Sequence, residues 1–134
     1  MHKSKLGGFI IDCQTDDLRG AADFWSAALG MPLREPPDGD PDKYSGKYKW
    51  LDDSQHDLHI EVQKVGHPSR VHLDIETDDI GAEVERLEKL GAKRLQQVET
   101  WWVMEAPTGQ RFCVVQASSR GFSARATQWP GADR

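Results

Sequence analysis

The stretch RVHLDIETDDIGAEVERLEKLG, residues 70–91, decides the fold. Its first residues alternate between apolar and polar side chains, the pattern of a strand with one buried face. Two short acids then precede a helical pattern in which apolar residues from Ile80 to Leu90 recur on one side. Gly91 follows, where a helix can end. The stretch therefore predicts a strand, a capped helix and a stop.

The same plan occurs earlier in the chain, in IIDCQTDDLRGAADFWSAALG, residues 10–30. Aligning the two TDD motifs places Asp12 over Asp74 and Ile10 over His72. In both copies the short acids can accept hydrogen bonds from the first backbone N–H groups of the helix. The chain therefore contains an internal repeat.

Strand-like segments separated by Pro, Gly and Asp turns follow each helix, so the order β-α-β-β-β occurs twice. This order predicts an α+β fold made of two βαβββ modules. Each helix should bury one apolar stripe, which in the first helix includes Phe24. We expect one domain, residues 1–134, comprising a first module at 6–65, a second at 70–116 and a C-terminal arm at 117–134.

Composition excludes several classes of protein. Net charge is −5 and the basic residues are scattered, so we expect no nucleic-acid partner. No apolar run approaches the roughly 20 residues of a membrane span, so we expect no membrane partner. The first residues lack a secretory signal, which predicts a cytoplasmic protein. Cys13 and Cys113 lie in apolar runs and are expected to be free thiols.

Strand alternation predicts a polar surface opposite each helix. In DLHIEVQ, residues 57–63, the apolar residues point one way, while His59 and Glu61 point the other. The same rule in the second copy places His72 and Asp74 together. If both helices lie outside, the polar faces surround a shared cavity that these four side chains line.

Aspartates and tryptophans extend this candidate site. Asp12 and Asp74 are related by the repeat, and they either bind a cationic ligand or pair structurally with Arg or backbone N–H groups. One of two adjacent tryptophans must face the cavity, and we place Trp102 there together with Trp50. Their flat rings can stack on a ligand, although core packing is the alternative use.

The segments HLDIETDDIGAEVERLEKLGA, residues 72–92, and WWVMEAPTGQRFCVVQ, residues 101–116, resemble the second module of the vicinal oxygen chelate superfamily of glyoxalases, bleomycin-resistance proteins and dioxygenases. The resemblance covers essentially residues 6–116. Within the superfamily, the resemblance is to the glyoxalase-like subgroup in particular. It implies a cupped mixed sheet with helices outside, ligand or metal held in the cup, and a homodimer or an intrachain pair. It does not fix a reaction.

The resemblance also identifies four positions where metal-dependent members carry ligands, usually His and Glu, on the first and last strands of each module. They are occupied here by Ile10, Glu61, His72 and Cys113. Ile10 cannot bind a metal, so the conventional site is incomplete and no cofactor is expected. The alternative is a divalent metal held by Glu61, His72 and Cys113 with one open position for water.

Three functional hypotheses follow. The first is a glyoxalase-like small-molecule-binding protein whose ligand lies in the cup. The second is a metal-dependent lyase, isomerase or ring-cleaving dioxygenase that uses Glu61 and His72, with His59 as acid–base group. The third is a drug-sequestering resistance protein. The expected ligand-binding residues are Asp12, Trp50, His59, Glu61, His72, Asp74, Trp102 and Cys113, and the catalytic candidates among them are His59, Glu61 and His72.

Overall fold

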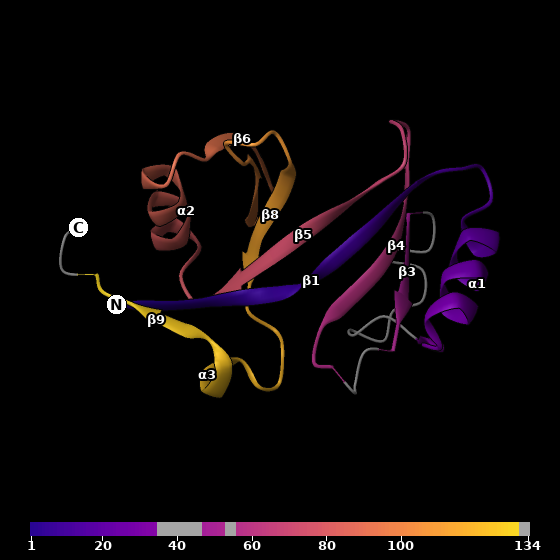
Figure 1. Ribbon diagram of the computed structural model, residues 1–134, viewed down its shortest axis with the longest axis horizontal. Helices are drawn as coiled ribbons and strands as arrows, with labels where there is room; N and C mark the ends of the chain where they lie inside the picture. The colour runs from indigo at the N-terminus through magenta and orange to yellow at the C-terminus, as the bar shows by residue number, and fades with distance from the viewer. Residues whose placement is uncertain (35–46, 53–55, 132–134) are drawn as a thin grey trace. The chain divides into compact units, whose positions relative to one another are not determined.

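The computed structural model describes residues 1–34, 47–52 and 56–131 (Figure 1). The described residues form nine strands and three helices with parallel and antiparallel pairing, which is the predicted α+β class. The backbone divides into two compact units. We call residues 9–71 the α1 unit, and residues 1–8 together with those from His72 onward the α2 unit. None of the helices in the described part is long and apolar enough to span a membrane.

The α1 unit comprises one helix and four strands. Helix α1 (Leu18–Leu29) contacts β2 (Leu33–Arg34), β3 (Tyr48–Leu51) and β4 (His59–Val65), and Figure 1 shows it running beside β3 and β4. The strand order is β2-β3-β4-β1, in which β2–β3 and β3–β4 pair antiparallel and β1 (His2–Gln14) contributes its second half. The elements of this unit follow one another in the order β-α-β-β-β.

Local sequence fixes both ends of α1. Asp17 accepts a hydrogen bond from the backbone N–H of Gly20 at 2.9 Å, as the TDD motif predicts. Gly30 ends the helix with φ 69°, a left-handed conformation that glycine adopts without steric cost. The expected burial of Phe24 is wrong, since 62% of this residue is exposed. Its neighbour Trp25 faces the core, and consecutive helical residues point about 100° apart.

The α2 unit has the same order of elements and contains a parallel pair of strands. Helix α2 (Ile80–Lys89) is followed by β6 (Lys93–Val98), β7 (Trp101–Glu105) and β8 (Arg111–Gln116). The strand order is β1-β5-β8-β7-β6, in which β5 (Arg70–Thr77) and β8 run parallel. Strands β1 and β5 thus contribute residues to both units.

One apolar core lies between α2 and its strands. The second TDD motif caps the helix as predicted, because Asp79 accepts a hydrogen bond from the Ala82 N–H at 3.0 Å. Leu90, expected on the buried stripe, is exposed because the helix already ends at Lys89. The buried core residues are Val84, Leu87, Met104, Phe112 and Val114.

The C-terminal segment packs on the α2 unit. It contains α3 (Phe122–Arg125) and β9 (Thr127–Trp129), and β9 pairs antiparallel with the start of β1. The indole N–H of Trp129 donates to the Ser4 hydroxyl at 2.8 Å, and the guanidinium of Arg86 lies 3.9 Å from the Trp129 ring centroid. These contacts hold the expected arm against the body of its own unit.

The buried acid Glu83 on α2 contacts side chains of both α2 and the start of β1. The Glu83 carboxylate is fully buried and accepts two hydrogen bonds from Arg86, at 2.8 and 2.7 Å, and contacts Nε2 of His2 at 2.8 Å. Burial by itself raises the pKa of Glu83, but the hydrogen bonds from Arg86, His2 and Ser4 outweigh it and lower the pKa below its usual 4.5. The ionised form is therefore the form that stabilises the fold.

Replacing Glu83 with Ala should lower the free energy of unfolding at neutral pH by about 3–5 kcal/mol, because it leaves a largely buried cation without its partner. A carboxyl whose folded pKa is lowered stabilises the protein above its unfolded pKa, and this contribution is lost as pH falls through the folded pKa. The gap between wild type and Glu83→Ala should therefore narrow below pH 4.5 in urea melts. Glu85→Ala, an exposed acid on the same helix, is the control. A gap independent of pH would contradict this account.

Candidate functional site

In the α1 unit, alternation along β4 separates a core face from a polar face. Ile60 and Val62 pack into the apolar clusters under α1. His59 and Glu61 therefore point to the opposite side of the strand. The predicted division of this strand is confirmed.

Two aromatic and two polar side chains gather on this polar face, and we call them the Trp50 cluster: Tyr48, Trp50, His59 and Glu61. The Trp50 and His59 rings meet edge to face at 4.7 Å, and Tyr48 stacks on Trp50 at 6.5 Å. His59 Nε2 shares a hydrogen bond with Glu61 Oε1. Glu61 is only 7% exposed and lies directly across from Trp50 in the β3–β4 register. The cluster therefore combines a half-buried tyrosine ring, packed on the buried Trp50, with a hydrogen-bonding acid and imidazole.

Asp12 lies on the same side of β1 as Ile10, because Ile11 and Cys13 pack toward α1. Its carboxylate is buried, and one oxygen lies 3.8 Å from Nε of Arg70. Burial raises the pKa of the neighbouring Cys13 thiol, and the Asp12 charge raises it further, against a hydrogen bond with Trp25. Cys13 is therefore a poor nucleophile at neutral pH.

Removing the Asp12 charge should partly release this thiol. In a Cys113→Ser background, Asp12→Asn should lower the pKa of Cys13 toward its usual 9.0, so that labelling by a thiol reagent at neutral pH is faster. The expected increase is roughly two- to fivefold, because only the thiolate reacts and burial still disfavours it. Asp16→Asn, an exposed acid on the following loop, should leave the rate unchanged. An unchanged rate in Asp12→Asn would show that Asp12 carries no effective charge.

The α2 unit carries a second group of polar side chains, which we call the His72 cluster: His72, Asp74 and Cys113. Nε2 of His72 lies 3.8 Å from Oδ1 of Asp74, and Asp74 faces Cys113 across the parallel β5–β8 pair. One potential ligand atom from each residue lies within 4.8 Å of the others. Imidazole, carboxylate and thiolate are all ligands that zinc and iron accept.

Glu76 continues the polar row of β5 and was not among the expected site residues. It is 1% exposed, its carboxylate lies 3.6 Å from Nζ of Lys5, and it hydrogen-bonds with the hydroxyl of Ser119. Gly7 leaves room for it, since a Cβ there would lie 3.0 Å from three Glu76 atoms. Alternation indicates the direction of Glu76, but its partners are distant in sequence. These contacts make Glu76 a structural residue of the α2 unit.

Most of the expected ligand-binding residues fall into these two clusters, one in each unit. Two residues lie elsewhere than the sequence predicts. Trp102 packs into the core beside α2, beneath the guanidinium of Arg94 at 5.3 Å, and does not join the His72 cluster. Among the metal candidates, His72 and Cys113 lie together, but the third donor beside them is Asp74. Glu61 belongs to the α1 unit, where His59 holds its carboxylate. Asp74 lies two residues after His72 on β5, and its closeness to Cys113 comes from the β5–β8 register, which local sequence does not specify.

The repeated β-α-β-β-β order is the one expected from the resemblance to the vicinal oxygen chelate superfamily of glyoxalases, bleomycin-resistance proteins and dioxygenases. More narrowly, the family model described as the glyoxalase-like domain matches residues 8–115. The chain therefore belongs to the glyoxalase-like domain family. No curated protein matches its sequence.

Solved structures share the fold at low sequence identity. A hypothetical protein from Bacillus halodurans aligns with a TM-score of 0.60 at 12% identity, over 87% of this chain and 96% of that one. A methylmalonyl-CoA epimerase from Streptomyces coelicolor aligns at 0.54 and 12% identity, over 86% and 96%. A 2,2',3-trihydroxybiphenyl 1,2-dioxygenase from Sphingomonas wittichii aligns at 0.54 and 14% identity, over 87% of this chain and 42% of the enzyme. These similarities establish the fold alone.

Proposed function

We propose that the protein binds a small organic molecule on the polar face of the α1 unit, through the Trp50 cluster. The observation that carries this proposal is the hydrogen-bonded His59–Glu61 pair beside Trp50, in which the carboxylate is nearly buried. A buried carboxylate costs free energy unless its hydrogen bonds compensate. Its position on a strand face turned away from the helix core supports a role in binding.

The chemistry of the cluster favours a particular kind of ligand. Tyr48, which is half-buried and stacks on the buried Trp50 ring, offers stacking surface for a planar group. Glu61 can accept a hydrogen bond from a hydroxyl or ammonium group of the ligand. Arg34, whose guanidinium lies 5.7 Å from the Trp50 ring centroid, adds a cation beside the same surface. We therefore expect a planar ligand that carries a hydrogen-bond donor and a carboxylate or another acceptor.

His59 is the acid–base candidate if the ligand reacts at this face. Its hydrogen bond with Glu61 orients the imidazole, and imidazole exchanges protons near neutral pH. In this proposal Glu61 positions the ring. An epimerase and a dioxygenase share the fold, so both proton transfer and ring cleavage are reactions to assay.

Drug sequestration is the alternative without catalysis, and the acidic net charge and the tryptophans suit a cationic aromatic compound. The homodimer and the cytoplasmic location expected from the sequence also stay predictions. A compound panel that includes bleomycin separates sequestration from the binding of a metabolite.

Isothermal titration calorimetry with methylmalonyl-CoA, 2,2',3-trihydroxybiphenyl and bleomycin should identify at least one compound that binds. Tyr48→Leu and Glu61→Gln should each weaken its binding about tenfold or more, because they remove a stacking surface or a charged acceptor. Trp102→Phe is the matched control, since Trp102 packs in the core beside α2. Equal weakening in Trp102→Phe, or unchanged binding in Glu61→Gln, would contradict the proposed surface.

A metal-dependent lyase, isomerase or dioxygenase is the second candidate, favoured by the His72 cluster. Its imidazole, carboxylate and thiol fit a zinc or ferrous ion, and the distances between their donor atoms require only small side-chain movements. In this proposal His72, Asp74 and Cys113 hold the ion, and Glu61 is not required. A divalent ion held there would polarise an oxygen of the ligand.

Cobalt titration tests this second candidate without an activity assay. Binding of Co²⁺ through Cys113 should produce the near-ultraviolet charge-transfer band of a cobalt–thiolate bond. Cys113→Ser should abolish the band, and Asp74→Asn should weaken Co²⁺ binding about tenfold or more because a charged ligand is lost. Cys13→Ser, which removes the other thiol, should leave the band unchanged. A band that survives in Cys113→Ser would exclude the site.

A further inference from the structure

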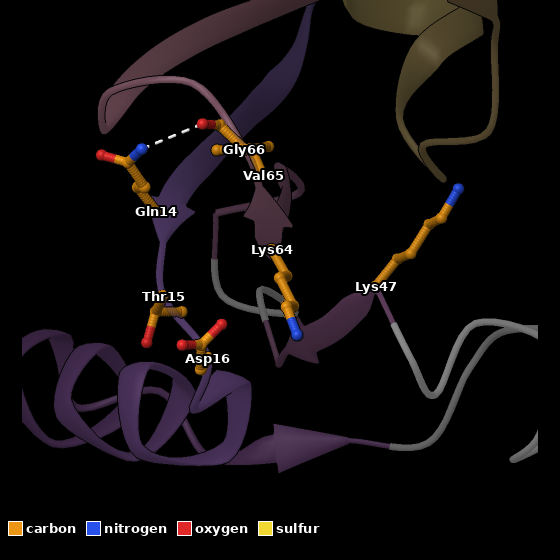
Figure 2. A pocket seen from close by; sticks show the side chains of 7 residues that line it. All are labelled: Gln14, Thr15, Asp16, Lys47, Lys64, Val65 and Gly66. Atoms are coloured by element: carbon orange, nitrogen blue, oxygen red, sulfur yellow. Dashed lines mark hydrogen bonds between the residues drawn. The ribbon is translucent and has the colours of Figure 1, made fainter.

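We propose a second binding site in the α1 unit, for a small organic phosphate or carboxylate that also carries hydroxyl or amino groups. The site is an open pocket of about 620 Å³ at the start of α1 (Figure 2). It does not rest on the function proposed above. Its lining residues are Gln14, Thr15, Asp16, Lys47, Lys64, Val65 and Gly66.

Hydrogen bonds fix the backbone around this pocket. The Lys64 N–H donates to the carbonyl oxygen of Lys47 at 2.8 Å, which connects the end of β4 to the start of β3. The Gln14 side-chain amide donates to the carbonyl oxygen of Gly66 at 2.9 Å, as the dashed line in Figure 2 shows, and the Gln14 backbone N–H donates to Ser69 at 3.0 Å. The pocket is therefore bounded by backbone that is already held in place.

The two lysines are the main argument for an anion. Tyr48 pairs with Gln63 in the β3–β4 register, so Lys47 and Lys64 are the next cross-strand pair. Like charges directly opposite each other destabilise a sheet. Within residues 1–34, 47–52 and 56–131, neither ammonium group makes a hydrogen bond or ion pair. Figure 2 shows the two side chains extending in different directions, which keeps their charges apart. An anion in the pocket would allow both ammonium groups to turn toward it.

The remaining polar groups around the pocket limit the chemical class of the ligand. Helix α1 begins beside Thr15 and Asp16, but its amino end adds little to an anion site because the Asp17 carboxylate already caps it. Asp16 contributes a carboxylate that would repel a second negative group but can accept a hydrogen bond from a hydroxyl or ammonium. This combination favours a hydroxy acid, an amino acid or a sugar phosphate over a simple polyanion.

The pocket and the Trp50 cluster use opposite faces of the same strands. Lys64 lies two residues after Val62 and therefore points to the same face of β4. Lys47 lies four residues before Leu51 and points to the same face of β3. Val62 and Leu51 both pack toward α1. The side chains of the Trp50 cluster point to the opposite face of the same two strands. An anion in the pocket therefore does not compete directly with a ligand on the Trp50 cluster.

Amide NMR titration tests the site with glycerol 3-phosphate and malate as probes. At least one should cause saturable shifts in residues 14–16 and 64–66, and comparing the two distinguishes phosphate from carboxylate. Lys47→Gln and Lys64→Gln should each weaken binding about tenfold or more, because each removes one charge-assisted contact. Lys49→Gln is the matched control on the same strand and face, and should weaken it less than about twofold. Asp16→Asn should strengthen the binding of inorganic phosphate, because it removes a repulsive charge.

Three outcomes would overturn the site. They are the absence of saturable shifts with both probes, equal weakening in Lys49→Gln, and shifts with uncharged glycerol as large as those with glycerol 3-phosphate. Choline binding in place of the anions would instead show that Asp16 dominates, and would equally refute the proposal. Circular dichroism of each variant confirms that the exposed substitutions leave the fold unchanged.

Discussion

Everything in this fold depends on one constraint, which is that a strand covered by a helix on one face must place its alternate side chains on the other. In β4 the constraint buries Ile60 and Val62 beneath α1 and leaves His59 and Glu61 together on the far side. The same packing in the α2 unit leaves His72 and Asp74 beside Cys113. The two candidate sites therefore follow from the way each helix builds its core.

Buried carboxylates fall into two groups with different roles. Glu83 and Glu76 are enclosed by partners from distant segments, so their charges stabilise the α2 unit. Glu61 is held by a residue of its own strand and lies beside an aromatic surface, which fits a group that meets a ligand. Asp74 faces a thiol and an imidazole at metal-ligand spacing. The side chains around each buried carboxylate therefore distinguish the acids that stabilise the fold from those that belong to a candidate site.

Sequence predicted the parts that depend on local chemistry. The TDD motifs gave both helix starts, and alternation gave the direction of His59, Glu61 and His72, because both signals act within a few residues. Alternation could not decide which of two adjacent tryptophans faces the core, so Trp102 was placed on the wrong side of β7. The pairing of Lys47 with Lys64 depends on the register of β3 against β4, which no local pattern specifies.

The central claim is that the Trp50 cluster is the ligand-binding surface, and histidine NMR tests it most directly. The panel compound that binds most tightly should be added while the ring signals of all five histidines are followed. The account predicts that the His59 signals shift and saturate with the bound fraction, while those of His56 and His67, outside the cluster, do not move. Unchanged His59 signals at full occupancy would contradict it, and a response confined to His72 would transfer the site to the metal-binding candidate.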